Sequence, residues 1–169
     1  MGSVPDLQTP QPFRVLIAGG SYGGLSAALN LYDLCRGLPP RCGPTPAAGE
    51  DLPETPQFAV DITIVDERDG FYHLIGSPLA LASEAFSEKC WVKYSDIPGL
   101  RAPDIHVVQG SVRSVDPERK VATYLPHGSD AEAQEVRYDY FVAASGLRRV
   151  WPVVPQSLRR KQYLHRRRW

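Results

Sequence analysis

One short segment combines small residues at a spacing that could bind a phosphate group. Residues 19–24 read GGSYGG, and they separate the apolar run Phe13–Ala18 from a helix-like pattern that starts at Leu25. A dinucleotide fingerprint, G-x-G-x-x-G, fits best with Gly19 first, Ser21 second and Gly24 third. The candidate phosphate-binding residues are those of the whole loop: Gly19, Gly20, Ser21, Tyr22, Gly23 and Gly24. The alternative is a glycine turn that only packs a helix on a strand.

The same fingerprint requires an acidic residue about 20 residues further on, where it holds a ribose. Asp66 ends the next strand-like segment and lies 42 residues after Gly24 (66 − 24). Removing the 20-residue proline-rich segment 38–57 leaves 22, which is the expected distance. Glu67 is the competing candidate, but strand alternation places it on the opposite face, and Asp66 is favoured. An acidic residue here suits an unphosphorylated ribose and disfavours a 2′-phosphate.

These residues require a strand, a helix and a second strand to position them. Phe13–Ala18 has the pattern of a central parallel strand, and Gly37 is a plausible end for the following helix. The residues 38–57 are expected to be an exposed insertion, since they hold six prolines. The pattern predicts a helix over 77–90, a turn at DPERK between two strands, and a central-type strand over 140–144.

The expected fold class is therefore α/β, a Rossmann-like domain with a parallel sheet, helices and a small antiparallel meander. We expect a disordered N-terminus over residues 1–12 and the nucleotide-binding domain over 13–155. A basic tail over 156–169 follows. Residues 140–169 contain eight Lys and Arg and no Asp or Glu, although the net charge of the chain is zero. Nucleic acid or an anionic membrane could bind such a tail, but a solvated or disordered end is favoured, and no nucleic-acid partner is expected.

The cysteines argue against a disulfide framework and against a structural zinc site. Cys35, Cys42 and Cys90 are odd in number and form no C-x-x-C pair. Cys35 lies on the apolar face of the predicted helix, so we expect it in the core. A reducing compartment fits best, which favours the cytoplasm, with association with mitochondria as the alternative. No signal peptide and no apolar run long enough for a membrane span are visible.

Three segments in order resemble the two-dinucleotide-domain flavoproteins of the pyridine nucleotide-disulfide oxidoreductase superfamily. The likeness is greatest to apoptosis-inducing-factor-like oxidoreductases and type II NADH dehydrogenases. The segments are VLIAGGSYGGLSAALNL, DITIVDERDGFYHL and VRYDYFVAASG. The resemblance implies that the 19–24 loop holds the FAD pyrophosphate and Asp66 the adenosine ribose. It also implies that Val112 contacts the adenine through its backbone and that Ser145 and Gly146 close the strand end near FAD.

The resemblance further implies an FAD-dependent NAD(P)H oxidoreductase that passes electrons to a quinone-like acceptor. NAD(P)H would be the cosubstrate, and its own fingerprint would follow about residue 155, so the domain is expected to be incomplete and the chain truncated. The alternative is a catalytically inactive nucleotide-binding or regulatory fragment. Peripheral contact with a membrane is compatible with this function. His73 is the one acid–base candidate near the cofactor, and a packed, hydrogen-bonded role is favoured for it. No metal site is expected.

Overall fold

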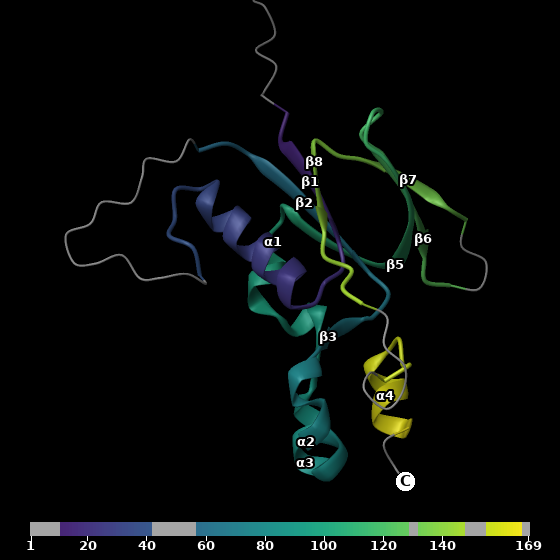
Figure 1. Cartoon of the computed structure of the whole chain (residues 1–169). Coiled ribbons are helices and arrows are strands. Elements are labelled where there is room, and N and C mark those ends of the chain that lie inside the picture. Colours follow the sequence, from purple (N-terminus) through teal and green to yellow (C-terminus); the bar gives the residue numbers. More distant parts are fainter. Residues whose placement is uncertain (1–10, 42–56, 129–131, 148–154, 167–169) are drawn as a thin grey trace, which may run out of the picture.

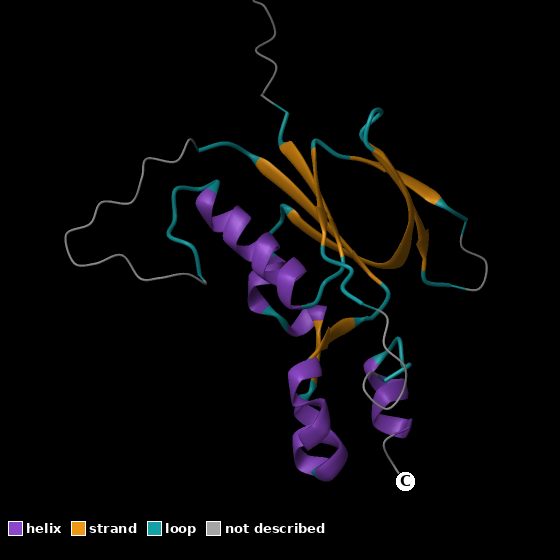
Figure 2. Ribbon diagram, in the orientation of Figure 1, coloured by secondary structure: helices purple, strands orange, loops and turns teal. Residues whose placement is uncertain are grey.

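The computed structural model describes residues 11–41, 57–128, 132–147 and 155–166, and these form an α/β fold (Figures 1 and 2). Nearly all of the expected disordered N-terminus and most of the proline-rich insertion, with Cys42, lie outside the described residues. The strands are β1 Phe13–Ala18, β2 Val60–Asp66, β3 Gly70–Tyr72, β4 Trp91–Lys93, β5 Ile105–Asp116, β6 Val121–Pro126, β7 Gln134–Arg137 and β8 Tyr140–Ala143. The α-helices are α1 Tyr22–Leu34, α2 Ser77–Ala82, α3 Glu84–Lys89 and α4 Arg160–Arg166.

Six strands form one sheet in the order β7-β6-β5-β2-β1-β8. The sheet is curled (Figure 2). The strands β5, β2, β1 and β8 are parallel, and β1 lies between β2 and β8, as predicted for a central strand. The long strand β5 serves two parts of the sheet. Its first half pairs with β2 in parallel, and its second half pairs with β6 in the antiparallel meander. The carboxyl ends of the parallel strands therefore meet at one edge, where Rossmann-like folds bind nucleotides.

Apolar side chains fill both faces of this sheet. Helix α1 covers one face, where Ala28 and Tyr32 pack against Ile17 and Ile62 of the two central strands (Figure 1). The meander curls over the other face and buries Leu16 with Val65. Since parallel strands buried on both faces must be apolar throughout, the sequence of β1 reads as a continuous apolar run.

Arg14 is the exception within that run, and it binds a carboxylate on a neighbouring segment. Its Nε and Nη2 atoms donate to the two oxygens of Asp139 at 3.0 and 2.9 Å, and its backbone N–H donates to the same carboxylate at 2.9 Å. Hydrogen bonds from Arg14 lower the pKa of Asp139 to about 2. The pair links β1 to the residue just before β8 and so fixes the register at this side of the sheet.

Two predictions about the secondary structure were wrong. The segment 77–90 forms two short helices rather than one, because Ser83 adopts an extended conformation and its hydroxyl accepts a hydrogen bond from the N–H of Phe86. Serine competes for backbone donors in this way and favours helix caps over helix interiors. Strand β8 is not central, since it forms the edge of the sheet in the part of the chain that the structure describes.

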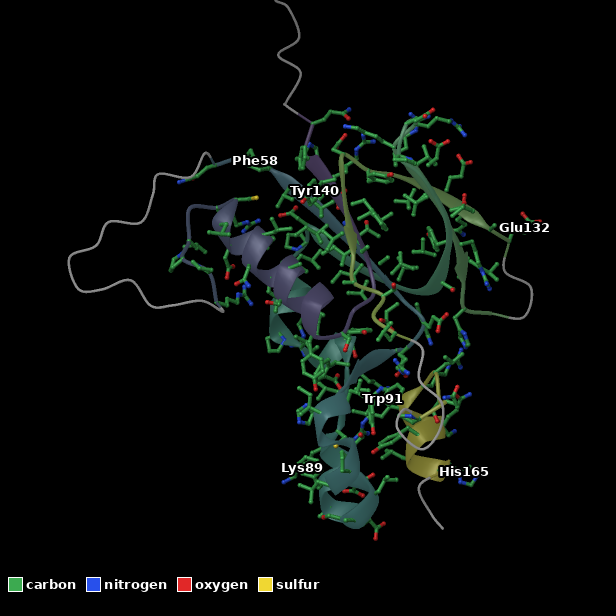
Figure 3. All side chains as sticks on the ribbon, in the orientation of Figure 1. Phe58, Lys89, Trp91, Glu132, Tyr140 and His165 are labelled. Carbon is green, nitrogen blue, oxygen red and sulfur yellow. The ribbon has the colours of Figure 1, made fainter. Side chains whose placement is uncertain are left out.

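A third correction concerns the basic tail, which is not simply a solvated end. Residues 160–166 form helix α4, which lies beside Trp91 of β4 (Figure 3). Tyr163 of this helix is buried against Trp91, with ring centroids 5.5 Å apart. The Tyr163 hydroxyl also lies 2.8 Å from the hydroxyl of Ser87. An apolar, aromatic contact in the middle of the basic segment thus holds it on the domain, although its charged residues stay largely exposed.

Candidate functional site

The glycine turn between β1 and α1 is tightly packed, and two of its glycines are required by that packing. Gly19 has a φ of +103°, and a Cβ atom there would lie 2.4 Å from the carbonyl oxygen of Ala144. A Cβ atom on Gly24 would lie 1.8 Å from the carbonyl oxygen of Gly19. These are the first and third positions of the fingerprint, for which glycine is expected on grounds of the tight turn and of close helix–strand packing.

Ser21, at the second position, is the N-cap residue of α1. The first helical hydrogen bond runs from Leu25 N–H to the Ser21 carbonyl oxygen, so the N–H groups of the first turn have no helical acceptor. Among the described residues, the Ser21 side chain makes no capping hydrogen bond. A helix start of this kind carries partial positive charge and is suited to a phosphate group.

Asp66 closes the turn from the neighbouring strand. Its Oδ2 accepts a hydrogen bond from Gly20 N–H at 2.7 Å, and its Oδ1 accepts one from Arg68 N–H at 2.8 Å. Each carboxylate oxygen can accept a second hydrogen bond, so the side chain retains capacity for a ribose hydroxyl. The carboxylate that the sequence assigns to a ribose is therefore also a structural part of the glycine turn.

Tyr94 also binds the turn, and no sequence motif points to this residue. Its hydroxyl donates to the Gly20 carbonyl oxygen at 3.0 Å, and a Cβ atom on Gly20 would lie 2.5 Å from this hydroxyl. Burial, with the nearby charge of Asp66, raises the pKa of Tyr94 far above its usual value, so the phenol stays protonated and remains a donor. Gly20 is thus held through both of its backbone polar groups.

A cavity of about 840 Å³ opens beside this turn, at the carboxyl ends of β1, β2 and β8. This volume is within the range of roughly 300–1,000 Å³ that is usual for small-molecule sites. Five of the predicted site residues line it: Gly19, Asp66, Val112, Ser145 and Gly146. The other five, Gly20, Ser21, Tyr22, Gly23 and Gly24, belong to the turn and the start of α1 next to it. The fold thus brings the three motifs of the sequence together.

Tyr22 and His73 form a contact on the exposed side of the turn. The Tyr22 hydroxyl lies 2.7 Å from His73 Nδ1, and it accepts a hydrogen bond from the N–H of Ile75 at 3.3 Å. Phe71 packs edge-on against the Tyr22 ring at 5.0 Å. His73 is therefore packed and hydrogen-bonded among aromatic rings, which is the role that the sequence favoured for it.

A part of the cavity wall that the sequence did not identify comes from residues 155–158. Gln109 Nε2 donates to the Leu158 carbonyl oxygen at 3.0 Å, and Asp69 N–H donates to the same oxygen at 3.0 Å. Asp69 Oδ1 also accepts hydrogen bonds from Trp91 Nε1 and from Arg160 N–H. Asp69 belongs to the acidic turn 66–69. A carboxylate in a turn has many possible partners, so the sequence alone could not predict that Asp69 binds this segment.

The remaining chemistry-bearing residues have structural environments. Cys35 and Cys90 are buried thiols, as expected for Cys35, and burial raises the pKa of each, which disfavours the reactive thiolate. In the described ranges, no group of three or more His, Cys, Asp or Glu side chains could hold a metal ion. The helices of these same ranges are all too short or too polar to cross a bilayer.

Known proteins share both the sequence and the fold of this chain, although no family model matches it. The chain is 50% identical over 165 residues to "Oxidoreductase OXR1" of Ajellomyces capsulatus, with 96% of this chain and 35% of that protein aligned. It is 25% identical over 133 residues to "Ferroptosis suppressor protein 1" of Taeniopygia guttata, with 79% and 26% aligned. The chain thus spans about a third of the length of the first of these relatives and about a quarter of the second.

Two solved structures have the same fold. NDH2 of Plasmodium falciparum, solved in complex with NADH, superposes with a TM-score of 0.59 at 16% identity and matches 83% of this chain and 24% of NDH2. The sulfide:quinone oxidoreductase of Aquifex aeolicus superposes with a TM-score of 0.54 at 21% identity and matches 92% and 30%.

The fold class is therefore confirmed as a Rossmann-like α/β domain with a parallel sheet and an antiparallel meander. The resemblance that the three motifs indicate is confirmed at the level of fold. The chain is similar to about one third of an oxidoreductase and has the fold found in part of NDH2 and of a sulfide:quinone oxidoreductase.

Proposed function

We propose that this chain is the FAD-binding portion of an FAD-dependent NAD(P)H oxidoreductase with a quinone-like electron acceptor. The observation that supports this most is the cavity where Gly19, Asp66 and Ser145 meet, from three motifs that are far apart in the sequence. The relatives support the reaction class, since one is named an oxidoreductase, one was solved with NADH and one is named for a quinone. A location in the cytoplasm, or in association with mitochondria, belongs to the same proposal.

The residues present fit an adenine dinucleotide. The turn leaves the backbone N–H groups at the start of α1 without a side-chain cap among the described residues, and side chains are sterically excluded at Gly19 and Gly24. A pyrophosphate would be held by the 19–24 turn, a ribose by Asp66, and an adenine by the backbone at Val112. Ser145 and Gly146 complete the wall at the end of β8.

FAD, when bound, supplies the redox chemistry, and the protein binds and orients it. This chain's contribution is to hold the pyrophosphate with backbone donors that are fixed before the ligand arrives. The Asp66–Gly20 and Tyr94–Gly20 hydrogen bonds set the conformation of the turn, so little conformational freedom is lost on binding. The NAD(P)H site and the acceptor site belong to the proposed whole enzyme and not to the residues described.

The second candidate is an inactive nucleotide-binding or regulatory fragment, which the partial coverage of the relatives keeps open. Titration of the purified 169-residue chain with FAD, followed by calorimetry and flavin fluorescence, tests the binding step that both candidates share. Electron transfer from NADH to a soluble quinone then separates them when it is measured in a chimera in which this chain replaces the aligned third of the Ajellomyces capsulatus relative. Turnover by the chimera favours the oxidoreductase portion, and FAD binding without turnover favours the inactive fragment.

A matched pair of alanine variants makes the binding test specific. In Gly24→Ala the new Cβ atom would clash with the Gly19 carbonyl oxygen. In Gly23→Ala the new Cβ atom would contact only the Cβ of Ala144, at 3.9 Å. We expect Gly24→Ala to lose FAD binding and stability, and Gly23→Ala to stay folded. A folded wild-type chain that takes up no FAD would contradict the proposed function.

A further inference from the structure

Arg68 is held at the rim of the cavity by the turn that follows β2. Its backbone N–H donates to Asp66 Oδ1 at 2.8 Å, so the residue is fixed two positions beyond the carboxylate assigned to the ribose. Its side chain lines the cavity together with Asp66, Gly19 and Ser157. No sequence motif singles out Arg68, because a single arginine in an acidic turn usually forms a local ion pair.

Among the described residues, the guanidinium of Arg68 forms no ion pair. Its Nε atom is buried and makes no hydrogen bond within the part of the chain that the structure describes. The ion pairs found in that part join other residues: Arg14–Asp139, Arg36–Asp104, Arg41–Asp33, His106–Asp61 and Arg119–Asp116. Arg68 as a whole is half-buried, so only its Nε atom is shielded from solvent.

The two carboxylates that precede it in the chain bind other groups. Both oxygens of Asp66 accept backbone hydrogen bonds, and Glu67 accepts one from the Ser111 hydroxyl at 3.1 Å. A cationic side chain that lines a cavity without an ion-pair partner among the described residues can pair with an anionic ligand there. An arginine stays charged, and its planar fork matches the oxygens of a phosphate.

We propose that Arg68 binds a phosphate group of the dinucleotide, as a second anion contact besides the backbone donors of the 19–24 turn. This inference rests on the proposed function, because it assigns a residue to the same cavity. The donors available for this contact are the terminal Nη atoms, because Nε has almost no exposed surface that a ligand atom could reach. Ligand phosphates would then be held from both β1 and β2. Stacking of the guanidinium on the adenine is the competing arrangement, and it differs from the phosphate contact in needing no phosphate on the ligand.

Binding of adenosine, ADP and FAD to the wild-type chain and to Arg68→Gln, measured by calorimetry at two salt concentrations, separates these arrangements. We expect Arg68→Gln to weaken ADP and FAD at least about tenfold, to change adenosine less than about twofold, and to reduce the salt dependence. Arg68→Lys should recover part of the loss, since it restores the charge without the fork. Arg119→Gln, which removes the same charge at the exposed β5–β6 turn, should bind all three ligands as the wild type does.

Equal weakening of adenosine and ADP by Arg68→Gln would overturn the phosphate contact in favour of stacking. Unchanged ADP and FAD affinities in Arg68→Gln would overturn any role of Arg68 while leaving the proposed function intact. A folded wild-type chain that binds none of the three ligands would overturn both. Thermal unfolding of each variant shows that the chain remains folded, so that a binding change is not a loss of structure.

Discussion

Asp66 Oδ2 lies 2.7 Å from the backbone nitrogen of Gly20, so the end of β2 is hydrogen-bonded to the glycine turn that follows β1. The two residues are 46 positions apart, and most of the proline-rich segment 38–57 lies between them outside the described residues. This contact joins the two motifs that the sequence suggested separately. It also gives Asp66 a structural task in addition to the proposed ribose contact.

The first prediction concerns Asp66, which has both of these tasks. Asp66→Asn removes the charge and leaves one side-chain oxygen to serve two backbone donors, so we expect FAD affinity to fall about 10- to 100-fold. Calorimetric titration measures the affinity. The matched control is Asp104→Asn, which makes the same chemical change in an exposed ion pair with Arg36. Equal FAD affinity in the wild type and Asp66→Asn would show that Asp66 has no part in binding.

The second prediction concerns Ser21, where the fingerprint has its second glycine. Ser21→Gly restores that glycine and should leave FAD affinity within about tenfold of the wild type, because a small residue is already accepted there. Ser21→Val should lose more than about tenfold, since its β-branched side chain cannot approach a phosphate and cannot donate a hydrogen bond. Fluorescence titration compares the three proteins. Equal affinities for all three would place the phosphate away from this turn.

The third prediction concerns Tyr94. Tyr94→Phe keeps the ring but removes the only hydroxyl that the structure shows bonded to the Gly20 carbonyl within its described ranges. A buried carbonyl without a partner should destabilise the fold by about 1–3 kcal/mol. Urea unfolding measures this change, and FAD affinity should fall as well, since the turn loses one of its two fixed contacts. Tyr124→Phe, whose hydroxyl bonds Gln134 on the exposed meander, is the control and should change stability little.

The fourth prediction is a pH dependence. Arg14 lowers the pKa of Asp139 to about 2 in the folded protein, below the ordinary value of 3.8. The stabilisation is therefore complete above pH about 4 and is lost as the pH falls through about 2. The pair is partly exposed, so Asp139→Asn should cost only about 1 kcal/mol at neutral pH. The difference in unfolding free energy between wild type and variant should vanish in acid, and a difference independent of pH would exclude this cause.

Much of the fold follows from local pattern. The apolar run of β1, the periodic face of α1 and the turn between β5 and β6 were all predicted, because each depends on residues that are close in the sequence. The break at Ser83 was missed, since a serine hydroxyl can cap a helix or remain inside one, and tertiary packing decides between them. The edge position of β8 was not predicted, because an apolar sequence is compatible both with a strand at the centre of a sheet and with an edge strand whose faces are covered.

The site residues also divide into those that the sequence identifies and those whose role depends on the fold. Gly19, Gly24 and Asp66 could be selected because a known chemistry requires these residue types at this spacing. Tyr94 and Arg68 could not, since their importance comes from what the fold places beside them: a carbonyl oxygen for Tyr94 and a cavity for Arg68. The docking of α4 through Tyr163 was likewise hidden within a strongly basic segment.

The central claim is that the cavity beside the glycine turn binds FAD, and an amide-resolved NMR titration of the chain with FAD tests it most directly. The account predicts saturable shifts of the amides of residues 19–24, 66–68 and 110–113, with one FAD per chain. Absence of shifts in the folded chain, or shifts confined to residues away from this cavity, would contradict it.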